Sequence, residues 1–497
     1  GEFIKQMVGE KNYELMREIK YTFDPQSIFN PNKIVDTPSM NTMLRYEPGQ
    51  STPKFNTIFR YYDQDVLEHA EQCNGSGDCR KTHLSGGTMC PSYMATRNEK
   101  DTTRARANVL REFLTRSDKV NRFDHEEIKD VMDLCLSCKG CKSECPSNVD
   151  MAKLKAEFLQ QYYDVHGVPL RSRLIANFSK SAKMGALLPA MYNFMVTNKG
   201  ISSVIKKASG VAAERSMPTM HKTTLRNWYK KRKLPVASYR KPEICLPAGK
   251  AENRKLYFFC DEFTNYNDTE IGIKAILLLE KLGYEVIIPK HEESGRTWLS
   301  KGLLRDAKKI VNKNITLLSS LISDETPLTG IEPSAILTFR DEYIDLAEDD
   351  KFEAAKQLAK NVFTIDEFIA NEIENGRIKS AQFTTEKRLV KLHGHCQQKA
   401  LSSLSPTVQL LSLPANYSVE IIPSGCCGMA GSFGYEKEHY DISMKIGELV
   451  LFPSIRNQEP DVIIAAPGTS CRHQIKDGTG RIAKHPVEVL YDALCAN

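Results

Sequence analysis

Several kinds of segment are missing from this sequence, and each absence narrows the class of protein. No apolar run is long enough to span a bilayer, so the sequence predicts no transmembrane helix. The sequence predicts no signal peptide, and the net charge of +6 over 497 residues is small. Because no recognition motif accompanies the basic residues, we expect no nucleic-acid partner. These absences indicate a cytoplasmic protein without an integral membrane segment; peripheral contact with a membrane remains an alternative.

The chain also lacks an initiator methionine and begins within an amphipathic helical pattern, GEFIKQMVGEKNYELMREIK, so we expect it to be part of a longer protein. Its 41% hydrophobic and 26% charged residues are typical of a globular chain. A chain of this length predicts about two to four domains. One basic tract, Lys222–Lys241 with the core KKRK, is interpreted as a solvated linker, with an acidic partner or a membrane surface as the alternative.

Cysteine, in contrast, is abundant and unevenly placed. The fourteen cysteines cluster, and several are separated by only two residues. A secreted disulfide scaffold would be a short chain with cysteines throughout, so this distribution instead indicates metal ligation in a reducing compartment.

The order of helical and strand patterns predicts a mixed fold with four consecutive parts. A terminal helix ends at the Asp-Pro and Asn-Pro turns of FDPQSIFNPN. Helical stretches then alternate with cysteines, and strand–helix–strand units with a tight glycine turn follow, which favours parallel α/β structure. The predicted parts are a terminal helix and tail (1–36), an α-helical cysteine-rich domain (37–165), a helical segment with the basic linker (166–255) and an α/β tandem-repeat domain (256–497).

The α/β part contains an internal repeat, with halves at 256–345 and 385–497. The segments YEVIIPKHEESG and YSVEIIPSGCCG share the tyrosine, Ile-Ile-Pro and the final glycine. The first half carries Glu293-Ser294 where the second carries Cys426-Cys427, and only Cys260 remains at its first strand end. We therefore expect the first half to be degenerate and the domain to hold at most one metal site, in its second half.

Residues 135–146 read CLSCKGCKSECP, which has the C-x2-C-x2-C-x3-C-P spacing of bacterial ferredoxins. Three thiolates on such a loop, here Cys135, Cys138 and Cys141, hold one [4Fe-4S] cluster, while the fourth cysteine, Cys145, ligates the other cluster of a pair. The alternative is zinc. Zinc sites usually pair two separated C-x2-C turns, however, and do not crowd four cysteines together.

The pairing rule requires a second motif that also ends in Cys-Pro, and Cys90-Pro91 supplies it. Cys90 would then complete the first cluster. Cys145 would cross to a second cluster site with Cys73 and Cys79 of CNGSGDC, where Ser76 stands in the place of a further ligand. Because only three of four ligands are identified, the alternative is a degenerate site with structural or free thiols.

Four more cysteines each follow a strand of the second half. They would meet at the carboxyl edge of a parallel sheet, where sites in α/β proteins form. His393 and His395 are candidate additional ligands, although a lone histidine is more often a structural residue. The four cysteines are Cys396, Cys426, Cys427 and Cys471. Cys245, Cys260 and Cys495 stand alone and are interpreted as buried or surface thiols.

Three arginines, Arg97, Arg104 and Arg106, follow the Cys90 loop. They could balance the charge of a cluster or pair with acidic neighbours on a solvated helix, and the sequence favours neither interpretation.

The region of paired cysteine motifs resembles the two-cluster helical domain of the iron–sulfur subunits of succinate dehydrogenase and of glycolate oxidase. In the former, a C-x5-C motif with a replaced middle cysteine marks a [3Fe-4S] cluster, and Cys73-x5-Cys79 is similar to it. The long loop between Cys79 and Pro91 departs from that compact motif. The type of the second cluster, and its presence, therefore stay open.

The motifs HGHC, SGCCG and GTSC resemble the CCG, or cysteine-rich, domain of heterodisulfide reductases and glycolate oxidase iron–sulfur subunits. This resemblance implies a metal site, holding either an iron–sulfur cluster or zinc, on the four cysteines of the second half. It departs from the family in the first half, which lacks the cysteine pair.

The opening segment MREIKYTFDPQSIFNPNKIV resembles the tail of the FAD-linked oxidase family, which includes D-lactate, glycolate and D-2-hydroxyglutarate dehydrogenases. Asn32 takes the usual glycine position, which is a departure. The resemblance implies FAD on a flavin domain or flavoprotein subunit N-terminal to this chain. It also implies electron transfer from a D-2-hydroxy acid, through the flavin and the clusters, to a quinone or redox protein, with no catalytic residue in this chain.

Two other functions are kept as alternatives. A thiol–disulfide oxidoreductase like heterodisulfide reductase would use the CCG site for catalysis, but the first half has lost its cysteine pair. A docking module would use the metal sites only to stabilise its fold.

Overall fold

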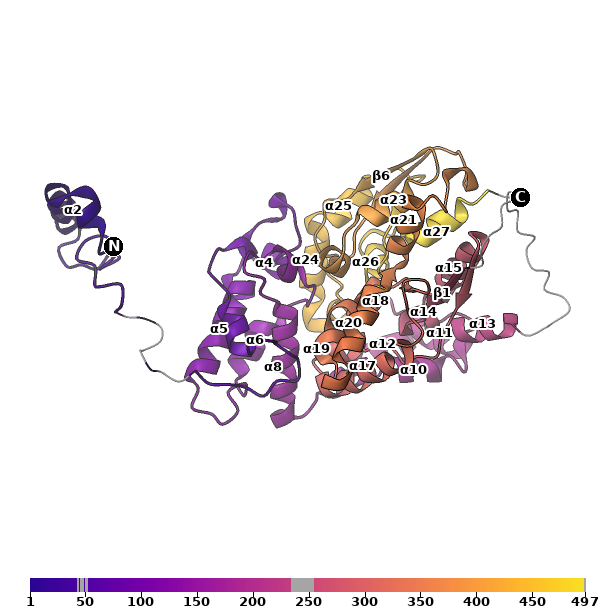
Figure 1. Cartoon of the computed structure of the whole chain (residues 1–497), viewed down its shortest axis with the longest axis horizontal. Helices are drawn as coiled ribbons and strands as arrows, with labels where there is room; N and C mark the ends of the chain where they lie inside the picture. The colour runs from indigo at the N-terminus through magenta and orange to yellow at the C-terminus, as the bar shows by residue number, and fades with distance from the viewer. Residues whose placement is uncertain (43, 45–48, 50–51, 234–253, 496–497) are drawn as a thin grey trace. The chain divides into compact units, whose positions relative to one another are not determined.

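A computed structural model describes residues 1–42, 44, 49, 52–233 and 254–495 of the chain (Figure 1). These residues form two compact units, 1–53 and 54–497. Cys245 and residues 234–241 of the predicted basic linker lie outside the described residues, whereas the described part of this tract forms a helix over Leu225–Lys233. The finer division into four parts stays a prediction.

The first unit is a short helical segment. It contains α1 (Ile4–Val8) and α2 (Glu10–Phe23). The carboxylate of Asp24, which caps α2, accepts hydrogen bonds from the backbone N–H groups of Ile28 and Phe29 at 2.8 and 2.9 Å. The Asp-Pro step therefore ends the helix as the sequence predicts, because the side chain of Asp24 closes the turn that follows.

The second unit begins with a bundle of helices around the cysteine motifs. The helix α8 begins at the predicted N-cap, where the Asp150 carboxylate accepts a hydrogen bond from Lys153 N–H at 3.1 Å. Leu67, Leu110 and Phe158 fill the core between the helices. The helices are α3 (Val66–Glu71), α4 (Pro91–Thr96), α5 (Thr103–Arg116), α6 (Glu126–Asp133), α7 (Gly140–Glu144) and α8 (Met151–His166).

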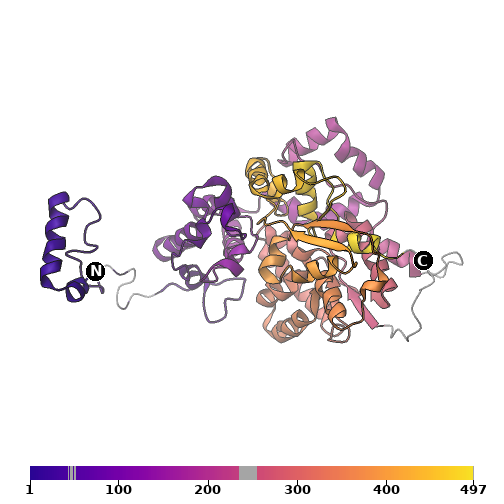
Figure 2. The same cartoon turned by 90° about the horizontal axis from the view of Figure 1, so that it is seen from above.

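Five further helices connect this bundle to the sheets. They are α9 (Leu170–Ala176), α10 (Phe178–Gly185), α11 (Pro189–Thr197), α12 (Lys199–Ser209) and α13 (Leu225–Lys233). Leu225 and Tyr229 of α13 enter the core of the α/β part. In Figure 2 the magenta helices of this segment lie at one edge of the unit, away from the strands.

The described strands form two parallel sheets with the same connectivity. The first sheet has the order β2-β1-β3-β4 and the second has the order β6-β5-β7, so the first three strands of each half are arranged alike. Arg254 pairs with Tyr284 in the first sheet, and Arg388 pairs with Tyr417 in the second. The shared order supports the internal repeat that the sequence predicts.

The first half carries two strands more than the strand–helix–strand unit that the sequence predicts. Its strands are β1 (Arg254–Phe258), β2 (Tyr284–Ile287), β3 (Leu328–Gly330) and β4 (Val362–Thr364), and β4 lies beyond the predicted end at residue 345. A strand of three residues is too short for a period-two pattern to reveal it. The helices are α14 (Glu262–Tyr266), α15 (Thr269–Lys281), α16 (Arg296–Ser300), α17 (Leu304–Leu318), α18 (Pro333–Ile336), α19 (Glu342–Leu346), α20 (Phe352–Lys360) and α21 (Ile365–Glu374).

The second half packs against the first in one shared core. Leu256 and Phe258 of β1 belong to the same buried cluster as Val390 and Leu392 of β5. The strands are β5 (Arg388–Leu392), β6 (Tyr417–Ile421) and β7 (Ile463–Ala465). The helices are α22 (Cys396–Leu401), α23 (Ser405–Leu411), α24 (Tyr440–Leu449), α25 (Leu451–Arg456), α26 (Thr469–Thr479) and α27 (Pro486–Asp492).

No helix among the described residues is long and apolar enough to cross a membrane.

Candidate functional site

Four buried thiols line one pocket in the helical bundle. The wall of the pocket includes the side chains of Cys90, Cys135, Cys138 and Cys141 together with Arg106. These are the four cysteines predicted to hold the first cluster. Thiolates are the donors that iron–sulfur clusters require, so the residues that line this pocket fit such a cluster.

Local backbone geometry brings these thiols to the pocket. Cys90 is the N-cap of α4 and Pro91 is its first residue, a position where proline needs no hydrogen-bond partner. In the CLSCKGC loop, Ser137 and Lys139 adopt left-handed conformations with φ of 50° and 61°. Such turns are unfavourable for residues other than glycine, and they fold the loop tightly enough to bring its three cysteines to one pocket.

Backbone and guanidinium N–H groups point at the sulfur atoms. Arg106 is fully buried, and its Nη1 donates to Cys90 Sγ at 3.3 Å. Its Nη2 donates to Ser92 Oγ at 3.0 Å, and its Nε donates to Val131 O at 3.0 Å. Met151 N–H donates to Cys141 Sγ at 3.4 Å. Hydrogen bonds to sulfur stabilise thiolate charge and are among the features that set a cluster's potential.

A buried ionic network holds the cluster loop to the α/β part. Lys139 lies between two of the predicted ligands, and it pairs with Asp341, with Glu342 at 3.0 Å and with Asp150 at 3.7 Å. Lys142 also pairs with Asp341. Burial alone would lower the pKa of Lys139, yet the three carboxylates together raise it well above its ordinary value. The loop therefore carries a fixed positive charge beside the pocket.

The thiols predicted for the second cluster differ in burial. Cys79 is buried, whereas Cys73 and Cys145 are half-buried beside the same core. Burial raises the pKa of Cys79, and contacts with Arg104 and Thr102 oppose this rise. The described contacts connect Cys73 with Cys79 but do not include Cys145, so this ligand set stays a prediction.

Ser76 lies exposed in the CNGSGDC loop, where its backbone N–H bonds to Asn74 Oδ1 at 3.0 Å. Gly75 and Gly77 on either side have φ of 77° and 83°. The loop is thus an Asx turn followed by a left-handed glycine.

The cysteines of the second half meet at the carboxyl edge of its sheet, as their positions after strands predict. Cys396 begins α22 after β5, Cys426 and Cys427 lie in the loop after β6, and Cys471 lies in the first turn of α26 after β7. All four thiols are buried. Cys426 contacts both Cys396 and Cys427, and Cys427 contacts Cys471, so the thiols form a continuous chain.

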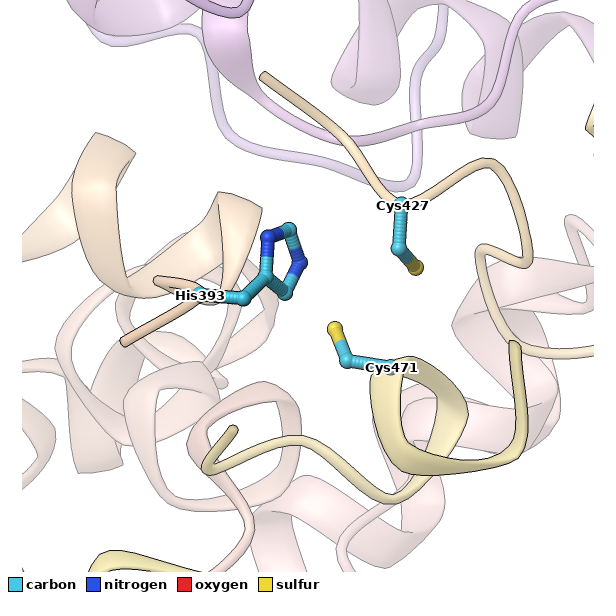
Figure 3. A group of neighbouring side chains, drawn as sticks. All are labelled: His393, Cys427 and Cys471. Carbon is cyan, nitrogen blue, oxygen red and sulfur yellow. The ribbon is translucent and has the colours of Figure 1, made fainter. Parts of the chain in front are cut away.

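His393 joins two of these cysteines in a compact group. Candidate ligand atoms of His393, Cys427 and Cys471 lie within 4.8 Å of one another. In Figure 3 the imidazole ring and the two sulfur atoms are turned toward one another. His393 Nδ1 lies 2.7 Å from Ser424 Oγ, whereas Nε2 is buried without a hydrogen-bond partner in the described part of the chain. An unpartnered buried nitrogen beside two thiols fits a metal ligand.

Contacts among the four thiols shift their pKa values in opposite directions. Contact with Cys426 lowers the pKa of Cys396 to about 6. Contacts with Cys426 and Cys471 lower the pKa of Cys427 well below its ordinary value, and the same contacts raise the pKa values of Cys426 and Cys471. A lowered thiol pKa favours the thiolate, which is the form that binds a metal ion.

Gly428, the glycine of the CCG sequence, cannot be replaced without moving the loop. Its φ is 93°, and a Cβ built on it would lie 2.2 Å from Ser443 O. Glycine therefore lets the Cys426-Cys427 backbone pass close to α24.

The first half replaces this arrangement with hydrogen bonds. Ser294 Oγ donates to Glu262 Oε1 at 2.7 Å, and Cys260 N–H donates to His291 Nε2 at 3.1 Å. Burial raises the pKa of Cys260 to about 12, which keeps it a neutral thiol. Among the described residues, a compact group of candidate metal ligands that contains cysteine lies in the second half; the number of metal sites stays a prediction.

The two thiol sites are neighbours. Cys138 belongs to the same buried cluster as Cys396 and Cys426, and after burial Cys396 is the strongest influence that raises the pKa of Cys138. The loop that precedes Cys426 also touches the loop that precedes Cys90, because a Cβ on Gly425 would lie 2.8 Å from Gly87 O. The backbones of the two domains therefore meet directly between the sites.

The three arginines behave differently from one another. Arg106 bonds to a predicted ligand, and Arg104 pairs with Glu99 at 2.6 Å and approaches Gly75 O at 3.4 Å. Arg97 lies beside His83 at 3.4 Å and caps α4.

His395 Nδ1 is also unpartnered within the described residues, but His395 lies outside the compact group. Ser424, which orients His393, and the carboxylates around Lys139 carry no signal in the sequence.

These two groups of buried thiols have the donor atoms that metal centres require. Comparison with family models points the same way. Residues 72–150 match the 4Fe-4S dicluster domain, and residues 1–34 match the C-terminal domain of FAD linked oxidases. The matches support the predicted relation to iron–sulfur proteins and FAD-linked oxidases. The assignment of the CCG domain stays a prediction.

Relatives of known name cover nearly the whole chain. It is 24% identical to D-2-hydroxyglutarate dehydrogenase of Escherichia coli and 26% identical to that of Pseudomonas putida, over 99% of this chain in each case and 50% of each relative. It is 23% identical to one subunit of the anaerobic glycerol-3-phosphate dehydrogenase of Escherichia coli, over 67% of this chain and 79% of that subunit. The chain thus spans about half the length of the D-2-hydroxyglutarate dehydrogenases it matches. No solved structure matches.

Proposed function

We propose that this chain carries electrons from the flavin of a FAD-linked oxidase, through two adjacent metal centres, to an acceptor. The observation that carries the proposal is the shared buried cluster of Cys138, Cys396 and Cys426, which joins the two thiol sites. Iron–sulfur clusters supply one-electron transfer when bound. Centres that share one apolar wall, with their loops in contact, are suited to pass electrons without exposure to water.

The chain's own residues would set the properties of these centres. Arg106 and Met151 N–H would stabilise thiolate charge at the first, and Lys139 would hold a positive charge beside it. Ser424 would orient His393 at the second, in the way that second-layer hydrogen bonds fix ligand histidines.

Features of the first unit lead us to propose a flavin domain as the electron donor. It matches the end of FAD linked oxidases, and α2 has no buried residue in this chain while Leu15, Ile19 and Phe23 are exposed. An unpartnered apolar helix face of this kind suits packing against a flavin domain. We further propose a D-2-hydroxy acid as the substrate class, since the dehydrogenase relatives carry that name, and a quinone or a redox protein as the acceptor.

The test is a metal and spectroscopic analysis of anaerobically prepared protein. We expect brown protein with about four to eight iron atoms per chain and matching sulfide, depending on cluster type. EPR of the reduced and oxidised protein would count the clusters and distinguish three-iron from four-iron types. Colourless protein that contains only zinc would contradict the proposal.

One observation favours a second candidate function. The lowered pKa values of Cys396 and Cys427 would suit thiol–disulfide chemistry like that of heterodisulfide reductase. The burial of all four thiols opposes it, because a disulfide substrate must reach the attacking sulfur. Disulfide reduction by the reconstituted chain alone, abolished by Cys427→Ser, would favour this second function.

A docking function without electron transfer makes a different prediction. Variants that lose a centre, such as Cys138→Ser, would keep electron flow from the flavoprotein to the acceptor. Loss of electron flow with unchanged binding of the flavoprotein would rule it out.

A further inference from the structure

The segment 165–213 contains basic residues but no acidic ones. No aspartate or glutamate lies between Asp164 and Glu214, although the chain as a whole has 62 acidic residues and 68 lysines and arginines. The segment comprises the helices α9 to α12. Its basic residues are Arg171, Arg173, Lys180, Lys183, Lys199, Lys206 and Lys207.

Large apolar side chains of the same segment face the solvent. Met191 and Phe194 of α11 are 56% and 58% exposed and lie on one side of the helix, and Leu187, just before the helix, is 79% exposed. Leu188 and Met195 extend the same face. Ile201 and Val204 of α12 are also exposed and lie on one side of that helix. A monomer seldom exposes a contiguous apolar face of this kind without a partner.

The opposite face of α11 is fixed to the protein. Asn193 bonds to the backbone N–H and C=O of Met220 through its side chain, at 2.8 Å in each case. Tyr192 OH donates to Pro218 O at 3.4 Å, and Val196 is buried. The helix is therefore docked by its polar and small apolar side, and the exposed apolar side is presented outward by a fixed backbone.

The charges around this face are available to a partner. Lys183 and Lys199 flank the uncharged stretch that holds α11, and both are exposed. Neither lysine has an ion-pair partner among the residues that the structure describes. Lys207 and Arg173 are exposed and unpaired in the same way.

We propose that the outer face of α11 and α12 binds the surface of an anionic lipid bilayer. An interfacial helix places apolar side chains among the acyl chains and lysines among the lipid phosphates, and the absence of acidic residues removes repulsion from those phosphates. At 1.5 Å per residue, the nine residues of α11 extend only about 13 Å, so the helix would lie in the membrane plane. A protein partner would not explain why acidic residues are excluded from the whole segment.

This inference does not rest on the proposed electron-transfer function. Vesicle binding is measured without a substrate or an electron acceptor, so each proposal can fail while the other holds.

The experiment is co-sedimentation of the full chain with lipid vesicles. One set contains phosphatidylcholine alone, and the other contains phosphatidylcholine mixed with phosphatidylglycerol. We expect the chain to sediment with the mixed vesicles and to be released by added salt. Met191→Glu with Phe194→Glu should weaken binding about tenfold or more, because both apolar anchors are lost. Lys183→Glu with Lys199→Glu should weaken it by about fivefold for each lysine.

A matched control places the same two changes elsewhere. Val120 and Ile482 are 107% and 77% exposed and lie outside the segment, so Val120→Glu with Ile482→Glu should leave vesicle binding unchanged. The proposal is wrong if the chain does not sediment with the mixed vesicles, or if Met191→Glu with Phe194→Glu binds as well as the control. A dimer that these two substitutions dissociate, without any vesicle binding, would assign the face to a second copy of the chain.

Discussion

Arg106 is a buried cation whose partners are all polar or anionic groups of the first site. Its guanidinium joins the Cys90 sulfur to Ser92 and to the end of α6, so it links a predicted ligand to two other elements. Its removal would leave Val131 O and Ser92 Oγ without their donor inside the core, and unpaired buried groups are costly.

We therefore predict that Arg106→Gln lowers the free energy of unfolding by about 2–4 kcal/mol. Arg104→Gln is the matched control, because Arg104 sits in a partly exposed ion pair with Glu99 and should contribute less than about 1 kcal/mol. Chemical denaturation of the anaerobic proteins measures both. Equal losses for the two variants would show that Arg106 has no special role.

The second site rests on Cys427, which contacts two thiols and belongs to the compact group with His393. Cys427→Ser should remove the metal of the second site while leaving the first cluster in place. Cys260→Ser is the control, since Cys260 is a buried neutral thiol in the half without a compact cysteine group. Metal analysis and EPR of both variants provide the test. Unchanged metal in Cys427→Ser would place the second centre elsewhere.

At the scale of elements, one histidine connects the helical bundle to the second half. His439, next to α24, lies 2.9 Å from Asp133 at the end of α6 and 3.0 Å from Glu436. Its ring stacks on Phe433 with centroids 4.2 Å apart. Burial alone would lower the pKa of His439, but the two carboxylates raise it to about 8. The contact is therefore an ion pair at neutral pH.

A folded-state pKa above the unfolded value of about 6.5 means that protonation favours the folded state. The stabilisation is fully present below about pH 6.5 and is lost as pH rises through about 8. A pKa shift of this size corresponds to about 2 kcal/mol in the free energy of unfolding. His439→Gln should remove this part of the pH dependence of the thermal midpoint. His166→Gln should not, because His166 pairs with Asp124 at an exposed site. A wild-type midpoint that does not fall over this range would contradict the prediction.

The elements also show which features of the fold and the sites could be predicted from the sequence. The spacing of the CLSCKGC loop and the strand-to-cysteine order pointed to thiols that lie near one another in the structure, because ligand spacing and parallel topology are local rules, whereas the grouping of Cys73, Cys79 and Cys145 stays a prediction. His393 was a candidate on equal terms with His395, and the distinction between them needed the fold, since the neighbouring thiols come from the loop after β6 and from α26. The strand β4 and the carboxylates that pair with Lys139 could not be predicted, because a three-residue strand and long-range ion pairs leave no periodic pattern.

At the scale of the whole second unit, the contact between Gly425 and Gly87 sets how closely the two groups of thiols approach. A side chain at Gly425 would clash with backbone atoms at 2.8 and 3.2 Å, which cannot move aside as a side-chain tip can. We predict that Gly425→Val lowers the free energy of unfolding by about 1–3 kcal/mol and slows electron transfer between the centres. Gly200→Ala, whose new methyl group would meet nothing closer than 3.6 Å, is the control. Unchanged transfer in Gly425→Val would show that the centres do not communicate across this contact.

The two halves of the α/β part share a strand order but differ in their cysteines. The half without the cysteine pair has a different role, which is to stabilise a loop of the helical bundle. The half without the cysteine pair supplies Asp341 and Glu342, the carboxylates that clamp Lys139 in the cluster loop of the other domain. The second half thus carries a group of candidate metal ligands, while the first half holds in place the loop with the cysteines of the helical bundle. Deletion of the first half would therefore first destabilise the CLSCKGC loop, although this loop lies far from the deleted residues in the sequence.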